Sequence, residues 1–185
     1  MPSNTFLPQN GSYRALRVYQ VAEVIYDITY YFVHHFLEVG DRTIDQMVQA
    51  ARSGKQNIAE GNQAATTSTE TEIKLTNVAK ASLEELLIDY EDYLRVRGLP
   101  QWEKTHPRYD KMRQYAQSKE LADNYKTLLP QLTAEEIANL CITLIHQAIY
   151  MLYRLLAHQQ ERFVKQGGIR EQMLNARLAY RNKNK

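Results

Sequence analysis

Apolar residues in this chain recur at alternating spacings of three and four along segments that contain no proline. Because an α-helix has 3.6 residues per turn, such spacing places the apolar side chains on one face of a helix. The pattern predicts four long helices, over about residues 13–37, 43–61, 69–97 and 134–165. No segment shows the strict alternation of apolar and polar residues that is typical of half-buried strands. The sequence therefore predicts an all-α fold.

Residues that commonly begin or end helices stand near these boundaries. Capping-box spacing occurs in three pairs, Thr43 with Gln46, Thr69 with Glu72, and Thr133 with Glu136. Ser12 is expected to cap the first helix. Glycines are expected to end the four helices at Gly40, Gly61, Gly98 and Gly167.

The lengths of the connections predict how the helices are arranged. Four long helices with short connections favour an antiparallel up-and-down four-helix bundle, which we expect to occupy residues 13–165. Residues 1–12 are expected to form a loose N-terminal arm, and residues 101–132 a helical insertion packed against the bundle. Residues 166–185 are expected to form a C-terminal helical tail. A length of 185 residues fits a single domain.

The net charge of +2 is distributed unevenly along the chain. Residues 1–161 carry 16 Lys and Arg against 20 Asp and Glu, a net charge of −4. Residues 162–185 carry seven basic residues against Glu171 alone, a net charge of +6. A basic tail of this kind is a candidate contact for RNA or DNA.

Cysteine usage and the N-terminal sequence indicate a cytoplasmic protein with no membrane association. Cys141 is the only cysteine, which excludes a disulfide framework and the paired cysteines of a structural zinc site. The first residues lack the features of a signal peptide, and no apolar run approaches about 18 residues. Glu103 and His106 have the Glu-x-x-His spacing of di-iron bundles, but the motif occurs once. We therefore expect no metal and no cofactor.

The segment from Gln46 to Gly61, which ends Asn57-Ile58-Ala59-Glu60-Gly61, resembles the four-helix-bundle family of 23S rRNA intervening-sequence proteins. The accessory variability proteins of diversity-generating retroelements are similar to the same family. Further matches lie in the first and third helices, at Leu16, Val18, Tyr19, Gln20, Ala22, Ala79, Ser82, Leu83, Glu85 and Leu86. The resemblance covers residues 13–97. It implies an up-and-down bundle that assembles as a ring-like homopentamer, with nucleic-acid association in some members and no enzyme activity.

Two departures from the family pattern affect the prediction of a site. Val48 and Gln49 stand where the family has two arginines, and Gly54 and Lys55 replace an Ile-Pro step. Arg52 and Lys55 supply positive charge close by. The resulting candidates for nucleic-acid binding are Arg52, Lys55, Arg162, Lys165, Arg170, Arg177, Arg181, Lys183 and Lys185. Asn57, Glu60 and Gly61 are expected to be structural, fixing the end of the second helix.

These observations predict a non-enzymatic, oligomeric scaffold or accessory protein that binds nucleic acid or a nucleic-acid enzyme. A second apolar set on the first helix, Val21, Ile28 and Tyr31, is expected to be exposed and to mark a contact between copies. Five copies are expected from the resemblance.

Two alternatives remain open. Arg154 and His158, one helical turn apart, resemble the Arg and His of bundle-type ribonucleases of toxin systems, which implies RNA cleavage. Alternatively, the chain is a pure protein-interaction module that recruits a protein partner through the insertion and the tail.

Overall fold

The computed structural model describes residues 11–183 of the chain, and within this range every regular element is a helix. The long helices are α1 (Arg17–Phe36), α2 (Arg42–Ala64), α3 (Thr69–Val96) and α6 (Ala134–Gln166). The shorter ones are α4 (Tyr109–Gln117), α5 (Lys119–Leu128) and α7 (Ile169–Lys183), with 3₁₀ turns η1 (Tyr13–Ala15) and η2 (Leu129–Gln131). The all-α prediction is confirmed. The first ten residues of the predicted N-terminal arm lie outside the described part.

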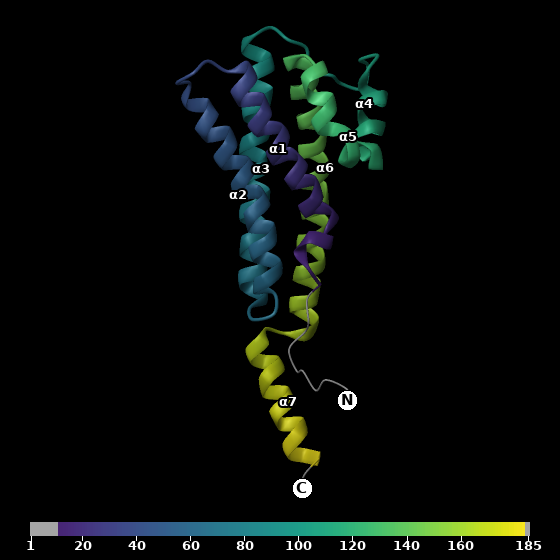
Figure 1. Ribbon diagram of the computed structural model, residues 1–185. Helices are drawn as coiled ribbons and strands as arrows, with labels where there is room; N and C mark the ends of the chain where they lie inside the picture. Colours follow the sequence, from purple (N-terminus) through teal and green to yellow (C-terminus); the bar gives the residue numbers. More distant parts are fainter. Residues whose placement is uncertain (1–10, 184–185) are drawn as a thin grey trace.

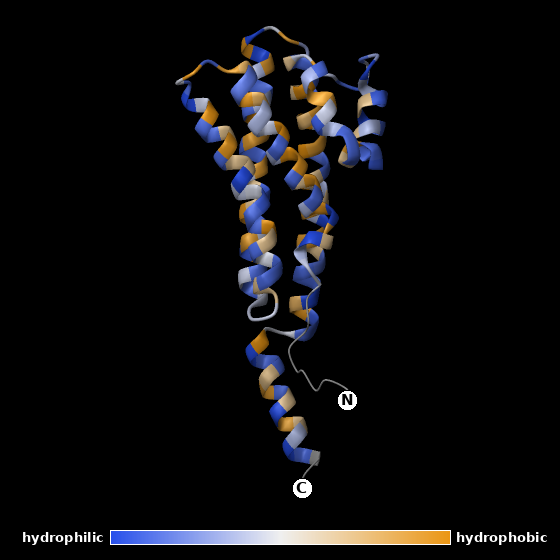
Figure 2. Ribbon diagram, viewed as in Figure 1, coloured by the Kyte–Doolittle hydropathy of each residue, from blue (hydrophilic) through white to orange (hydrophobic). Residues whose placement is uncertain are grey.

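The four long helices lie side by side and pack in the pairs α1–α2, α2–α3, α3–α6 and α1–α6 (Figure 1). The α4 and α5 helices lie beside the upper half of α6, and α7 extends beyond its lower end (Figure 1). Apolar and polar residues are interleaved along each long helix, as expected where one face is buried (Figure 2).

The core contains large side chains from all four long helices. Those that are fully buried include Ile25, Phe32, Met47, Leu83, Leu86, Tyr90, Leu144 and Ile145. Each such side chain contributes roughly 1.5–3 kcal/mol through its removal from water. Three polar groups join helices inside this core: the Tyr90 hydroxyl donates to Thr29 Oγ1 at 3.1 Å, and Thr29 lies 3.8 Å from Cys141 Sγ. Burial raises the pKa of Cys141 to about 12, so its thiol is protonated and unreactive at neutral pH.

Within the described residues, one helical stretch, Ala134–Asn182, which contains α6, is long and apolar enough to span a membrane by length and composition, although the sequence suggested no such run. The apolar residues of α6 are largely part of the core. Ile137, Leu144 and Leu152 are all buried among the side chains of neighbouring helices. Packing within the molecule therefore accounts for this composition.

The prediction that Val21 and Ile28 are exposed is wrong, because both are buried, at 2% and 0% of their accessible surface. Both belong to the buried cluster that contains residues of all four long helices, and the segment expected to be an insertion also contacts α1. Leu121 and Tyr125 of α5 belong to the same buried cluster, and the Tyr125 hydroxyl donates to Asp27 of α1 at 2.6 Å. Val21 and Ile28 are thus covered within one chain, whereas Tyr31 is partly exposed.

The helix ends agree with the sequence at some positions and differ at others. Thr133 and Glu136 form a complete capping box at the start of α6, as predicted. The predicted cap of α2 is wrong, because Asp41 caps it, accepting from the Thr43 backbone N–H at 2.9 Å. Ser68 caps α3, so Thr69 is the first helical residue.

Two predicted glycine ends also differ. The α1 helix stops at Phe36, before Gly40, and the α2 helix runs through Gly61 to Ala64. Gly61 is buried inside the helix, so its expected role at a helix end is wrong.

Gly54 and Gly61 lie two turns apart on the face of α2 that packs against α3. A Cβ atom at Gly54 would lie 2.8 Å from Cδ2 of Leu83, whose side chain is fully buried. A Cβ atom at Gly61 would lie 3.4 Å from the Glu72 carbonyl oxygen, an ordinary contact distance. The close approach of the two helices thus requires glycine at Gly54 but not at Gly61.

We predict opposite effects of alanine at these two positions. Gly54→Ala should lower the free energy of unfolding by about 1 kcal/mol, because overpacking at Leu83 exceeds the gain in helix propensity. Gly61→Ala should raise it by about 0.5–1 kcal/mol, because alanine is favoured inside a helix. Urea unfolding followed by circular dichroism measures both, and equal effects would contradict the close contact at Gly54.

Candidate functional site

The α7 helix presents the exposed basic residues of the tail. Gly167, with φ of 70°, ends α6, and the Gly168 N–H donates to Glu171 Oε2 at 2.9 Å as α7 begins. Arg170, Arg177 and Arg181 are exposed, and their spacings of seven and four place them on one stripe of the helix. Within the described part of the chain, none of these three arginines forms an ion pair.

Apolar side chains lie on both sides of this arginine stripe. Met173 and Tyr180 are 50% and 73% exposed on one side, and Leu174 and Leu178 are 58% and 46% exposed on the other. Apolar and polar residues are interleaved along α7 (Figure 2). A contiguous exposed surface of this kind is typical of an interaction site.

The structure does not bring the other predicted basic residues to this stripe. Arg162 pairs with the carboxylate of Glu72, and Lys165 pairs with Glu161 at 2.6 Å. The Lys55 ammonium lies 4.1 Å from the centre of the Tyr26 ring, and Arg52 is exposed on α2. Lys185 and the side chain of Lys183 lie outside the described residues. Arg170, Arg177 and Arg181 are therefore the candidates that remain together.

Arg162 belongs to a polar network between α3 and α6 rather than to the exposed tail. Glu72 is buried, and Gln159 Nε2 donates to both Glu72 Oε1 and Thr76 Oγ1 at 3.1 Å. Burial raises the pKa of Glu72, and the charge of Arg162 is the largest influence that lowers it. The guanidinium thus compensates a carboxylate that has lost its water.

The residues of the family-like motif have separate surroundings. Asn57 Nδ2 donates to the Ser53 carbonyl oxygen at 2.9 Å, and the Ser53 hydroxyl lies 2.9 Å from the Ser82 hydroxyl of α3. Glu60 is exposed. Asn57 therefore lies at a polar contact between α2 and α3, whereas Glu60 faces solvent.

Arg154 and His158 are both exposed on α6. Arg154 Nη1 donates to the Tyr150 hydroxyl at 3.3 Å, and Tyr150 lies one turn before it. Tyr150 is 61% exposed, so this pair lies in open solvent. The ribonuclease hypothesis stays a prediction.

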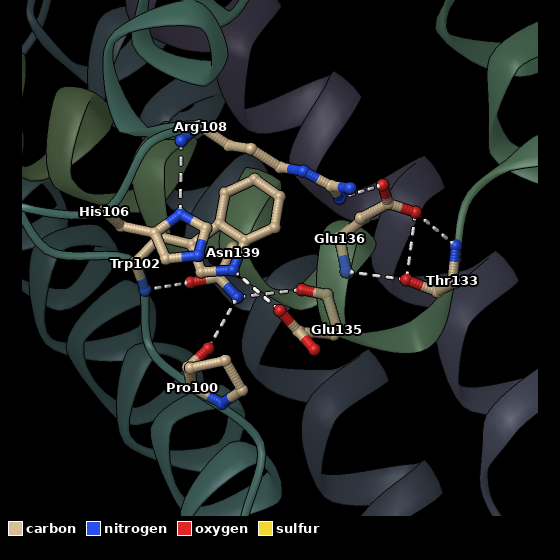
Figure 3. Close-up of polar contacts among 8 residues, drawn as sticks. All are labelled: Pro100, Trp102, His106, Arg108, Thr133, Glu135, Glu136 and Asn139. Carbon is tan, nitrogen blue, oxygen red and sulfur yellow. Dashed lines mark hydrogen bonds and ion pairs between the residues drawn. The ribbon is translucent and has the colours of Figure 1, made fainter.

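A polar cluster that sequence reasoning missed fixes residues 100–108 to the start of α6 (Figure 3). Asn139 accepts from the Trp102 backbone N–H at 2.7 Å and donates to the Pro100 carbonyl at 3.1 Å. Trp102 Nε1 donates to Glu135 Oε1 at 2.8 Å. Asn139 lies outside the apolar stripe of the last long helix, so the helical period gave no signal of its burial.

Three more residues complete this cluster. The His106 ring stacks on Trp102, with centroids 4.6 Å apart, and Arg108 Nη1 donates to Glu136 Oε1 at 2.7 Å (Figure 3). Glu103 is exposed, and the described residues contain no group of three or more His, Cys, Asp or Glu side chains that could hold a metal ion. His106 acts here as a ring that covers tryptophan.

A pocket of about 680 Å³ lies beside this cluster, between α4, α5 and α6. Met112, Leu132 and Leu140 give it an apolar part, and Lys111 and Glu120 lie on its lining as well. The Tyr115 hydroxyl, also on the lining, donates to Asn124 Oδ1 at 2.7 Å. Its polar groups thus bond largely to one another.

Comparisons with family models, with curated proteins and with solved structures find no match to this chain. The family resemblance noted from the sequence therefore stays a prediction. What defines the protein here is an all-α fold with an exposed C-terminal helix.

Removing the charge that compensates Glu72 should destabilise the fold. Arg162→Ala is expected to lower the free energy of unfolding by about 2 kcal/mol at neutral pH, because the buried carboxylate loses its partner. The folded-state pKa of Glu72 then rises further above its unfolded value. The loss should therefore be small below the unfolded pKa and grow as pH rises through the folded pKa.

Urea unfolding at several pH values measures this effect. Arg170→Ala is the matched control, because Arg170 is exposed and unpaired within the described residues. Equal losses in the two variants, or a loss independent of pH, would contradict the role of Arg162.

Asn139→Ala should release residues 100–108 from α6. Loss of the acceptor for Trp102 and of the donor to Pro100 should cost about 2 kcal/mol of unfolding free energy. Trp102 is the only tryptophan and is 8% exposed, so its fluorescence should shift to longer wavelength as water reaches it. Asn175→Ala, at an exposed position of α7, should change neither quantity. Unchanged emission in Asn139→Ala would exclude this anchoring role.

Proposed function

We propose that this protein is a non-enzymatic scaffold or accessory protein that assembles with copies of itself through α7. The exposed surface of α7, with three unpaired arginines between four exposed apolar side chains, is the observation that carries this proposal. Such a combination of arginine, tyrosine, methionine and leucine is typical of the central residues of protein interfaces.

The proposed body is an antiparallel up-and-down four-helix bundle of α1, α2, α3 and α6. The pairwise packing of these helices, each with two neighbours, supports this arrangement. The α4 and α5 helices would be an insertion that covers α1 and α6. A ring of five copies and a cytoplasmic location are proposed from the sequence alone.

Nucleic acid is the second candidate partner, because Arg170, Arg177 and Arg181 could contact successive phosphates along one stripe. Phosphate contact alone leaves the apolar side chains of α7 in water, whereas contact with a protein surface buries them. The apolar residues therefore favour a protein partner over RNA or DNA.

The proposal predicts that removing α7 converts the assembled protein to single chains. Light scattering behind a sizing column at micromolar concentration should give several times the mass of one chain for the full protein. A version ending at Gln166, which keeps all of α6, should give the mass of one chain. Retention of the larger mass by the shortened version would exclude α7 as the assembly contact.

The full chain and the version ending at Gln166 also test nucleic-acid binding, and two point variants test the ribonuclease hypothesis. Binding of labelled RNA or DNA by the full chain, lost on shortening and weakened steeply by salt, would favour the nucleic-acid function. RNA cleavage that disappears in both Arg154→Ala and His158→Ala would favour the ribonuclease.

A further inference from the structure

The α3 helix carries an acidic surface that the fold leaves open. Between Ala81 and Leu94 it contains five acidic residues and no basic one, namely Glu84, Glu85, Asp89, Glu91 and Asp92. Ala81, Glu85, Ile88 and Asp92 are exposed and follow one another at spacings of four, three and four. We call the surface formed by Ala81, Glu85, Ile88 and Asp92 the α3 acidic face. These four residues lie along one line of the helix.

Two of these five charges are paired inside the chain, Glu84 with Lys80 at 2.8 Å and Asp92 with Arg95. Among the described residues, neither Glu85 nor Asp89 forms an ion pair. Asp92 pairs with Arg95 at 2.7 Å, but both side chains are more than half exposed, so exchanging this partner costs little. Burial and the charges of Asp92 and Glu85 raise the pKa of Asp89, as expected for crowded like charges.

The spacing of the α3 acidic face matches that of α7 when the two helices run in opposite directions. Arg170, Leu174, Arg177 and Arg181 follow one another at spacings of four, three and four. Read backwards, Asp92, Ile88, Glu85 and Ala81 have the same spacings. In this single register, two arginines of α7 lie opposite two acidic residues of α3. The exposed apolar residues Leu174 and Ile88 also lie opposite each other.

We propose that α7 of one copy of this chain packs antiparallel on the α3 acidic face of a second copy. Arg170 then lies opposite Asp92, Leu174 opposite Ile88, and Arg177 opposite Glu85. Arg181 lies opposite the small Ala81, with Glu84 close by. The inference rests on the proposed function, in which α7 is the contact between copies, and it names the surface that receives α7.

The parallel orientation gives a poorer match. With Arg170 opposite Glu85 and Arg177 opposite Asp92, Leu174 falls opposite Asp89 and Arg181 opposite Val96. Each of the last two pairs sets an apolar side chain against a charged one. Packing and charge therefore both favour the antiparallel register.

A second copy is required because α7 cannot reach this register on its own α3. Arg170 lies at the start of α3, where it lines the same pocket as Thr69 and Glu70. Asp92 follows Glu70 by 22 residues along the helix, or roughly 33 Å at 1.5 Å per residue. The α7 helix and the α3 acidic face that receives it therefore belong to different chains.

Reversing the charges on each side tests the pairing. Glu85→Arg with Asp92→Arg alters the α3 acidic face, and Arg170→Glu with Arg177→Glu alters α7. Each double variant alone should dissociate into single chains, with a dissociation constant raised about tenfold or more. An equimolar mixture should associate again into species with equal numbers of the two variants, because each altered surface then meets a complementary one. Asp110→Arg with Asp123→Arg, at exposed positions of α4 and α5, is the control of equal charge change and should assemble normally.

Light scattering gives the masses, and circular dichroism verifies that each variant keeps its helices. Dissociation of both variants with recovery in the mixture would support the pairing. If the version ending at Gln166 dissociates but the altered α3 acidic face does not, α7 is the contact and this receiving surface is wrong. If shortening has no effect, the proposed function itself fails.

Discussion

One side of α6 is buried along most of its length, from Ile137 to Leu156, and several other helices are placed by contact with it. The α1 and α3 helices pack on its sides, and α4 packs near its start. Polar contacts fix both ends of this arrangement. Asn139 holds residues 100–108 near the beginning, while Gln159 and Arg162 meet Glu72 near the end. Apolar burial supplies most of the stability, and these polar groups select one arrangement among many that would bury similar area.

Properties that depend on local sequence could be predicted, and those that depend on distant segments could not. The 3.6-residue period identified the helices, and the Thr133 box gave the start of α6, because both involve residues within one turn. Asp41 and Thr43 are both good caps, and nothing local decides between them. The burial of Val21 and Ile28 depends on how other helices pack against α1, so periodicity alone left that face open.

The candidate site shows the same division. The charge count identified the basic tail, and Arg170, Arg177 and Arg181 are exposed there. Arg162 belongs to the same count but pairs with Glu72, 90 residues earlier, so its role required the tertiary structure. The exposed apolar residues of α7 could have been found from the sequence, since they follow the helical period. Only the structure shows that α7 extends away from the rest of the molecule (Figure 1), which leaves these apolar residues exposed.

The joint between α6 and α7 consists of Gly167 and Gly168. At Gly167 a side chain is excluded twice, because φ is 70° and a Cβ atom would meet the carboxylate of Glu171. In an assembly made through α7, the dihedral angles at this joint set the rotation from each subunit to the next. The number of subunits in a closed ring, or the pitch of an open filament, would then be encoded in two residues that lie outside the proposed contact.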